Sequence, residues 1–219
     1  VVDVSLRMVP GEGDRRLALR GYTFEIDGSF GHEVDTVTHL GTHVEAPAHY
    51  YEQGKDVTAY PPELFMGTMV HLRFSEIEPN GEIDREMVEE ATKGISLKGK
   101  IVVVSTPHFR HDPRTDQRSI LSYEATKYLV DSGIKLMGFD DSVTIDVSAE
   151  LAQKIHRILF DNGVLIIEYM GHLDTLRKKE SYLIALPLRV VGFDSSPVRA
   201  IVIEERDPSP PSRPKVEGS

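Results

Sequence analysis

The sequence predicts a single mixed α/β domain. The chain has 219 residues, of which 40% are hydrophobic and 27% are charged. That length and composition are typical of one globular domain with a real core. Short strand-like segments fill the N-terminal half, whereas helical and strand-like segments alternate in the C-terminal half. This order of elements favours a mixed sheet with helices packed on it.

Strand-forming residues and turn signals predict the elements of the N-terminal half. Residues 1–6 alternate apolar and polar side chains, and a Pro-Gly-containing segment at 10–14 interrupts the chain. Thr, Val, Phe and Tyr dominate two further segments, 22–26 and 34–40, and a short segment at 71–74 has the same character. We expect strands at these four places.

Capping residues and glycines delimit the helices that we expect. Asp84, Ser122 and Ser148 are suitable N-caps for helices over 84–92, 122–132 and 148–162, and a glycine follows the end of each helix. The third helix has apolar residues at helical spacing. Apolar segments between and after these helices predict further strands, at 101–104, 134–139, 164–170, 190–191 and 200–203.

Two segments carry no apolar pattern. Residues 107–119 form a long polar connection, and such loops are often functional lids. Its residues His108, Phe109, Arg110 and His111 are candidates for substrate contact, although a solvated surface loop is the simpler interpretation. Residues 204–219 contain four of the thirteen prolines. We therefore expect the domain to span 1–203 and to be followed by a Pro-rich tail at 204–219.

The charge and the absence of cysteine exclude several classes of function. There are 25 Lys and Arg against 35 Asp and Glu, so the formal net charge is −10. An acidic surface repels phosphate backbones and anionic lipids, so we expect neither nucleic acid nor a membrane as a partner. Without cysteine the chain has no disulfide, thiolate ligand or thiol nucleophile. We expect a cytoplasmic protein, while the start at Val1 leaves a removed leader open.

Three of the nine histidines lie in the segment HLGTHVEAPAH, which runs from position 39 to position 49. In an extended chain, residues of equal parity project to one side, which groups His39, His43, Glu45 and His49. On a straight strand the first two histidines are about 13 Å apart, too far to share one metal ion. The backbone must therefore bend between them, and Gly41 permits that bend. His43 and Glu45 are about 6.6 Å apart and suit a shared ion directly.

Two later residues are candidates for the same site. His156 lies at the edge of the inward face of the third helix, and Glu168 lies within the otherwise apolar segment 164–170. A buried carboxylate there needs a cation or several donors. A helix, a turn at Gly163 and a returning strand can bring the two side chains together, which favours a joint site. A core histidine and an edge carboxylate that reaches solvent are the alternative interpretations.

The segment HLGTHVEAPAH resembles the H-x-G-T-H-x-D-x-P-x-H motif of the cyclase family of metal-dependent hydrolases, which includes bacterial kynurenine formamidase and isatin hydrolase. The segments KIHRILFDNGVLIIE, GFDDSVTID and SPVRAIVI are also similar to parts of that family. The resemblance implies a compact fold of the swivelling β/β/α type that assembles as a homodimer or homotetramer. It also implies metal ligands at His39, His43, Glu45, His156 and Glu168, and a catalytic acid/base at His49.

Two positions depart from the family pattern. The usual Asp of the motif is Glu45, so the number of metal ions, one or two, stays open. The formamidases carry a tryptophan near the N-terminus, and this chain has none. Nitrogen and carboxylate ligands without sulfur fit Zn²⁺ or Mn²⁺.

We expect a small-molecule substrate and hydrolysis of a C–N bond in an amide, formamide or lactam. A metal-bound hydroxide would attack the carbonyl carbon, and His49 would carry the proton to the leaving group. A lactone or ester hydrolase with the same site, or a non-catalytic protein that holds a metal, are the alternatives.

Overall fold

The structure is a computed structural model that describes residues 1–108 and 116–205. Most of the expected tail at 204–219 therefore lies outside the described residues, as do Phe109, Arg110 and His111 of the polar connection. The Nε2 atom of His108, at the near end of that connection, lies 2.6 Å from the carbonyl oxygen of Ile77. No helix in the described part of the chain is long and apolar enough to cross a membrane.

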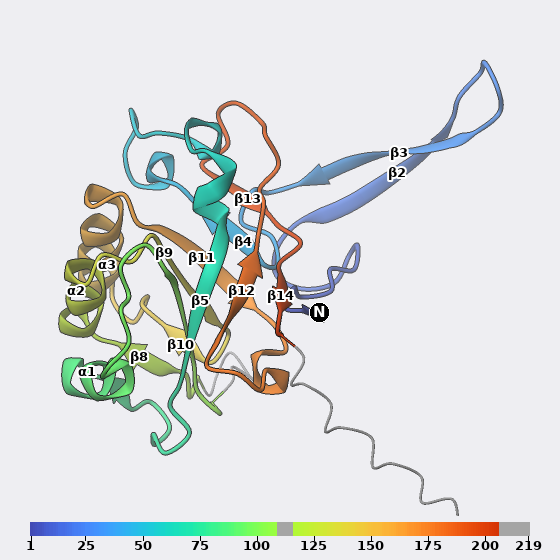
Figure 1. Ribbon diagram of the computed structural model, residues 1–219. Helices are drawn as coiled ribbons and strands as arrows, with labels where there is room; N and C mark the ends of the chain where they lie inside the picture. Colours follow the sequence, from blue (N-terminus) through green and yellow to red (C-terminus); the bar gives the residue numbers. More distant parts are fainter. Residues whose placement is uncertain (109–115, 206–219) are drawn as a thin grey trace, which may run out of the picture.

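A twisted nine-stranded sheet forms the centre of the molecule (Figure 1). Its four central strands run parallel to one another, and the strands on either side of them pair antiparallel. In spatial order the strands are β1 (Val2–Asp3), β14 (Ile201–Ile203), β12 (Glu180–Ile184), β5 (Met66–Arg73), β7 (Ile101–Ser105), β9 (Leu136–Asp140), β11 (Leu165–Met170), β4 (His43–Glu45) and β13 (Ser195–Pro197). Every residue of β7 and β9 is buried, as expected of parallel strands with both faces covered.

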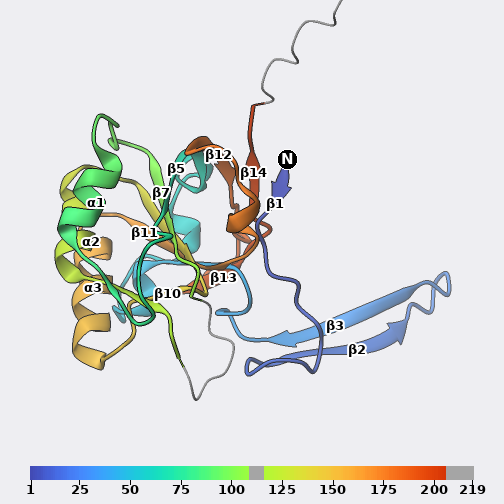
Figure 2. The ribbon, with the colours of Figure 1, turned by 90° about the horizontal axis from the view of Figure 1, so that it is seen from below.

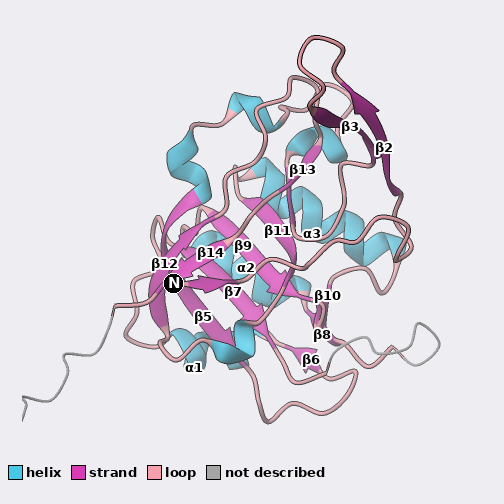
Figure 3. Cartoon of the chain, turned by 90° about the vertical axis from the view of Figure 1, so that its right-hand side faces the viewer, coloured by secondary structure: helices cyan, strands magenta, loops and turns pink. Residues whose placement is uncertain are grey.

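Three helices pack side by side on one face of the sheet: α1 (Arg85–Thr92), α2 (Tyr123–Asp131) and α3 (Ala149–Asp161) (Figures 1 and 2). Figure 3 views the sheet from the opposite side, with the helices behind the strands. The side chains of Asp84, Ser122 and Ser148 each accept a hydrogen bond from a backbone N–H of the first helical turn. These bonds satisfy donors that a helix start leaves free, and all three predicted helices are confirmed.

A small second sheet contains three short parallel strands in the order β10 (Val143–Thr144), β8 (Ser119–Leu121) and β6 (Glu82–Ile83). Short 3₁₀ turns at η1 (Pro47–His49), η2 (Val57–Ala59), η3 (Pro62–Phe65) and η4 (Leu173–Thr175) complete the body. The predicted mixed α/β domain is thus confirmed.

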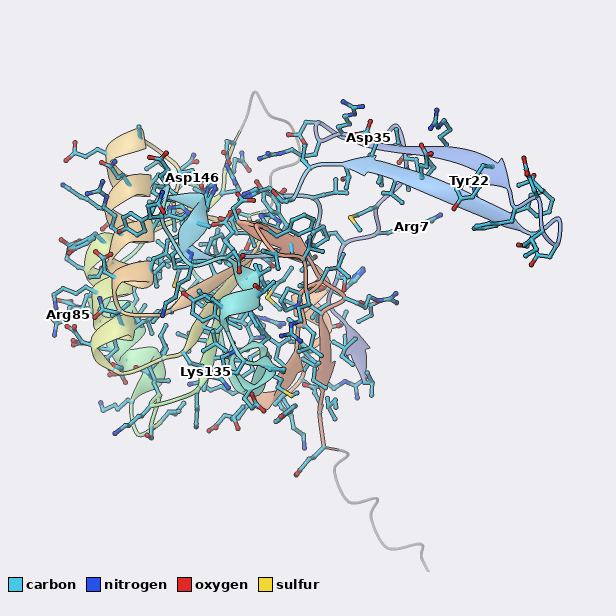
Figure 4. All side chains as sticks on the ribbon, turned by 90° about the horizontal axis from the view of Figure 1, so that it is seen from above. Arg7, Tyr22, Asp35, Arg85, Lys135 and Asp146 are labelled. Atoms are coloured by element: carbon cyan, nitrogen blue, oxygen red, sulfur yellow. The ribbon has the colours of Figure 1, made fainter. Side chains whose placement is uncertain are left out.

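One hairpin stands apart from this body. Strands β2 (Leu17–Thr23) and β3 (Phe30–Thr36) pair along their whole length with each other and, within the described residues, with no further strand. The hairpin projects from the body as a two-stranded ribbon (Figures 1, 2 and 4). We call residues 17–36 the arm.

Several strand boundaries differ from the expected ones. The strand expected at 34–40 ends at Thr36, because the chain must turn from the arm into the body. The strand expected at 22–26 ends at Thr23, where the turn of the hairpin begins. Residues 190–191 form no strand and belong to a turn completed by Gly192, whose φ is +87°. Strand β12, with its single fully buried residue Leu183, was not predicted.

Candidate metal centre

Strand β4 carries the first two site residues into the interior. It lies between β11 and β13, and all three of its residues are buried. His43 and Glu45 share one face of the strand, while Val44 faces the core between them. Gly41 precedes the strand with a φ of +56°, a conformation that favours glycine, and this turn lets His39 approach from outside the strand.

The last residue of the motif reaches the same place by a different route. Pro47 starts the 3₁₀ turn η1, and His49 ends it. The turn directs the imidazole back, so that its Nε2 lies 4.0 Å from Oε1 of Glu45. Its side chain is 32% exposed, whereas those of His43 and Glu45 are 2% and 3% exposed. His49 therefore forms the solvent side of the site.

Helix α3 and strand β11 supply the two distant residues. The Nε2 of His156 lies 3.3 Å from Oε2 of Glu45. Glu168 pairs with His43 in the register of β11 and β4, and its Oε2 lies 3.8 Å from Nε2 of His43. Both side chains are buried. The structure thus brings together six side chains: His39, His43, Glu45 and His49 of the motif, His156 of the third helix and Glu168 of the returning strand.

Strand β11 is irregular at the site. Its pairing with β9 shifts register between Ile167 and Met170, and Tyr169 has a φ of +55°. The hydroxyl of Thr42 donates a hydrogen bond to the carbonyl of Tyr169 across this irregularity. The Tyr169 ring stacks on His43, with ring centroids 5.8 Å apart. Such bulges often occur beside functional sites, where they redirect a side chain.

Hydrogen bonds at the outer nitrogen, Nδ1, of His43 and His156 orient the inner nitrogen, Nε2, of each ring toward the centre. The Nδ1 of His43 lies 2.7 Å from the carbonyl of Gly41, and the Nδ1 of His156 lies 2.7 Å from the carbonyl of Ala152. Since a carbonyl only accepts, each Nδ1 carries the proton. Each Nε2 therefore presents a lone pair toward Glu45. This arrangement is characteristic of histidines that bind metals.

Asp194 orients the ring of His39 in the same way, by accepting a hydrogen bond at the outer nitrogen. The sequence does not predict this residue. Its Oδ2 lies 2.8 Å from Nε2 of His39 and 3.4 Å from Nδ1 of His49. Thr38 donates to its other oxygen at 2.8 Å. No motif spacing points to this residue. The available signal is its position just before β13, whose pairing with β4 brings it beside the motif.

The donor set fits a cation. Among the residues that the structure describes, Nε2 of His43 and Oε2 of Glu45 are buried and have no hydrogen-bond partner. Such atoms are costly to bury unless something else binds them. Three groups of described ligand atoms lie within 4.8 Å of one another: His39, His43 and Glu45; Glu45, His49 and His156; and His39, His49 and Asp194. Glu168 belongs to none of these three groups.

The two buried carboxyl groups have opposite electrostatic behaviour. Burial by itself raises the pKa of Glu45, but the neighbouring imidazoles of His156, His39 and His43 outweigh it and hold this pKa well below its usual value. Burial, and then the charges of Glu45 and Asp146, raise the pKa of Glu168 well above its usual value. A cation beside both carboxyl groups would favour the ionised form of each.

A cavity of about 530 Å³ opens beside this centre. His39 and Tyr169 belong to both the centre and the cavity wall. The rest of the wall includes the N-terminal residues Leu6, Arg7, Met8, Val9 and Arg15. The volume suits a small molecule.

Comparison with known proteins agrees with this geometry. Residues 4–147 match the model of the Cyclase family. The chain is 28% identical to the kynurenine formamidase of Bacillus cereus over 164 residues, which is 75% of each protein. It is 29% identical to the kynurenine formamidase of Salinibacter ruber over 171 residues, 78% of each.

Solved structures share the fold. A potential metal-dependent hydrolase with cyclase activity matches with a TM-score of 0.76 and 24% identity, over 94% of this chain and 98% of that one. Isatin hydrolase A from Labrenzia aggregata matches with a TM-score of 0.74 and 20% identity, over 92% of each chain. The expected β/β/α fold is thereby confirmed. The chain belongs to the cyclase family and is a metal-dependent amidohydrolase of that family.

Proposed function

We propose that the protein hydrolyses a C–N bond in a small amide, formamide or lactam. The observation that carries this proposal is the convergence of four imidazoles on the buried carboxylate of Glu45. The names of the similar proteins, kynurenine formamidase and isatin hydrolase, support an amide or lactam as the substrate class. No feature of the described residues favours a lactone, an ester or a purely binding role over this reaction.

His39, His43, Glu45, His156 and Glu168 would hold the metal, as Zn²⁺ or Mn²⁺. When bound, a divalent ion supplies an acidified water and a positive charge beside the substrate carbonyl. Glu45 faces His39 and His43 with Oε1 and His156 with Oε2. Both oxygens of Glu45 thus have imidazole nitrogens beside them, so Glu45 would help to hold either one ion or two. Metal analysis of wild type and Glu45→Asp, both purified without added metal, tests the number: an unchanged metal content and activity in Glu45→Asp would mean that the extra methylene of Glu45 is neutral.

His49 is the proposed acid/base. Burial is the largest influence on its pKa and lowers it below its usual value, so the ring is neutral at pH 7. Its Nε2 faces the metal ligands, and its Nδ1 faces Asp194, a carboxylate that orients the ring. A neutral Nε2 accepts the proton of the attacking water and then delivers it to the leaving nitrogen as the C–N bond breaks.

The experiment separates ligands from the proton carrier. We expect His49→Ala to retain wild-type metal content and to lower kcat by about 10²- to 10⁴-fold on the best substrate of a panel of formamides, cyclic imides, lactams and lactones. His39→Ala should lose metal, and the arm variant His32→Ala should match wild type. Metal loss in His49→Ala but not in His39→Ala would reverse the two roles. Hydrolysis of lactones alone, or of nothing in the panel with either metal, would overturn the proposed reaction.

A further inference from the structure

The ring of Tyr50 contacts two histidines of the candidate metal centre. It stacks on the ring of His156, with centroids 4.2 Å apart and planes 17° apart. It also meets the ring of His49 edge-on, with centroids 5.0 Å apart and an angle of 79° between the planes. Aromatic pairs favour edge-to-face and offset stacked packing. One side chain thus contacts both the proposed acid/base and a proposed metal ligand.

Two consecutive tyrosines attach the turn η1, which ends at His49, to helix α3, which carries His156. Tyr50 directly follows the turn, and its backbone N–H donates to the carbonyl of Pro47 at 3.0 Å. The hydroxyl of Tyr51 donates to Oδ1 of Asp161, the last residue of α3, at 2.7 Å. The two contacts differ in kind, because Tyr50 packs on imidazoles through its ring and Tyr51 reaches the end of the helix through its hydroxyl.

The hydroxyl of Tyr50 plays no part in these contacts. Tyr50 is partly buried, and within the described residues its hydroxyl forms no hydrogen bond. Its ring has a third aromatic neighbour in Phe160, at a centroid distance of 6.3 Å, and Phe160 lies 5.8 Å from the ring of His156. The ring of Tyr50 therefore closes an aromatic cluster around His156, with His49 at its edge.

The polar contacts of His49 leave its ring loosely held. In the described part of the chain, the carboxylate oxygens near its two nitrogens lie at 3.4 Å, from Asp194, and at 4.0 Å, from Glu45. Both distances exceed the usual length of a hydrogen bond. The side chain is also 32% exposed. Packing against neighbouring rings, those of Tyr50 and of His39 at 4.3 Å, therefore has to limit the movement of this imidazole.

We infer that Tyr50 is a positioning residue, whose ring holds the imidazole of His49 at a fixed place relative to His156. This inference rests on the proposed function, because the position of His49 matters to the reaction only if His49 carries the proton. A proton carrier has to stay within hydrogen-bond reach of the groups that it serves. A displacement of about 1 Å can lower the rate about 100-fold.

Two substitutions of Tyr50 separate the ring from the hydroxyl. Tyr50→Leu removes the ring and keeps an apolar side chain, so we expect kcat on the best substrate of the panel to fall about 10- to 100-fold. KM should stay within about threefold of wild type, because substrate binding is not affected. Tyr50→Phe keeps the ring and should retain wild-type kcat. Wild-type kcat in Tyr50→Leu, or an equal loss in Tyr50→Phe, would overturn the inference.

Two further tyrosines supply matched controls. Tyr182→Leu makes the same change at a side chain that is 41% exposed on β12 and should leave kcat unchanged. Tyr51→Phe removes the hydrogen bond to Asp161 and leaves the ring contacts with the imidazoles in place. We expect wild-type kcat in this variant too. A loss as large as in Tyr50→Leu would mean that attachment of the turn, and not the ring of Tyr50, sets the rate.

NMR of the metal-free protein tests the position of His49 without any activity. The rings of His49 and His156 have centroids 5.9 Å apart, so their carbon-bound protons should give a nuclear Overhauser effect in wild type. We expect this signal to be lost in Tyr50→Leu and kept in Tyr50→Phe and Tyr182→Leu. Its persistence in Tyr50→Leu would overturn the inference. If wild type hydrolyses nothing in the panel, the proposed function fails, and the NMR result still decides whether Tyr50 positions His49.

Discussion

The arm and the metal centre are neighbours in the sequence and opposites in the structure. The arm spans 17–36 and the histidine motif spans 39–49. Apolar side chains of the arm such as Val34 and Phe30 are mostly exposed, whereas the charged and polar residues His43 and Glu45 are almost fully buried. The comparison teaches that the partners of a residue decide whether it can be buried. The hydrogen bonds at the outer nitrogens of the histidines, and the cation that we propose between these side chains, make a polar interior tolerable.

The largest contrast concerns packing. Leu165 in β11 is fully buried, and Val34 in the arm is 62% exposed. Leu165→Ala should lower the free energy of unfolding by about 2–5 kcal/mol through lost burial and a cavity. Val34→Ala should change it by less than about 0.5 kcal/mol. Urea denaturation of both variants, with a chelator present to exclude metal effects, measures the difference. Equal losses would mean that the arm is packed in solution as tightly as the body.

The second contrast concerns pH. Burial, and then the charge of Arg73, lower the pKa of His71 to about 4, below the unfolded value of about 6.5. The folded state therefore holds fewer protons in this range, so the stability that His71 contributes is complete above pH 6.5. It declines as pH falls toward 4, by as much as about 3 kcal/mol.

Denaturation of wild type, His71→Gln and His32→Gln at pH 7, 5.5 and 4.5 tests this. His71→Gln should flatten the dependence, while His32→Gln, on the exposed arm, should retain the wild-type slope. A wild-type slope in His71→Gln would show that other groups cause the loss of stability in acid.

The smallest contrast compares two carboxylates. Asp194 contacts two histidines of the centre, and Asp35 pairs with Arg16 on the arm. Asp194→Asn should lower metal affinity or kcat by about 10- to 100-fold, as removal of an outer partner usually does, and should change the pH profile of kcat. Asp35→Asn should leave both unchanged. Wild-type values in Asp194→Asn would limit that carboxylate to a structural contact.

The sequence predicts the helices well because their signals are local. Ser148 caps α3, and a glycine follows its end, without any help from distant residues. Strand boundaries depend on what the chain pairs with, which is why β12 was missed and why the strand expected at 34–40 ends early. Alternation of side chains does not reveal whether a ribbon lies in the core or, like the arm, in solvent.

The residues of the candidate site also divide into those that local sequence signals predict and those that only the folded chain brings together. His39, His43, Glu45 and His49 lie close together in the sequence, so their grouping follows from spacing and from the bend at Gly41. Asp194 could not be found like this, because 145 residues separate it from His49 and only the pairing of β13 with β4 brings it near. Burial gives Glu168 its raised pKa, and burial is likewise a property of the folded chain.

The irregular peptide at Tyr169 has a consequence for how this enzyme can change. In a regular pleat, residues 168 and 169 would point to opposite faces, yet here the acid and the ring both lie against His43. Tyr169, which lines the cavity, and Glu168, a carboxylate of the candidate metal centre, are thus consecutive residues in one irregular stretch of backbone. A substitution that changes the cavity wall at Tyr169 therefore acts on the neighbouring carboxylate too, whereas Met8 and Val9 line the same cavity from the N-terminal segment and are not adjacent in the chain to any of these carboxylates.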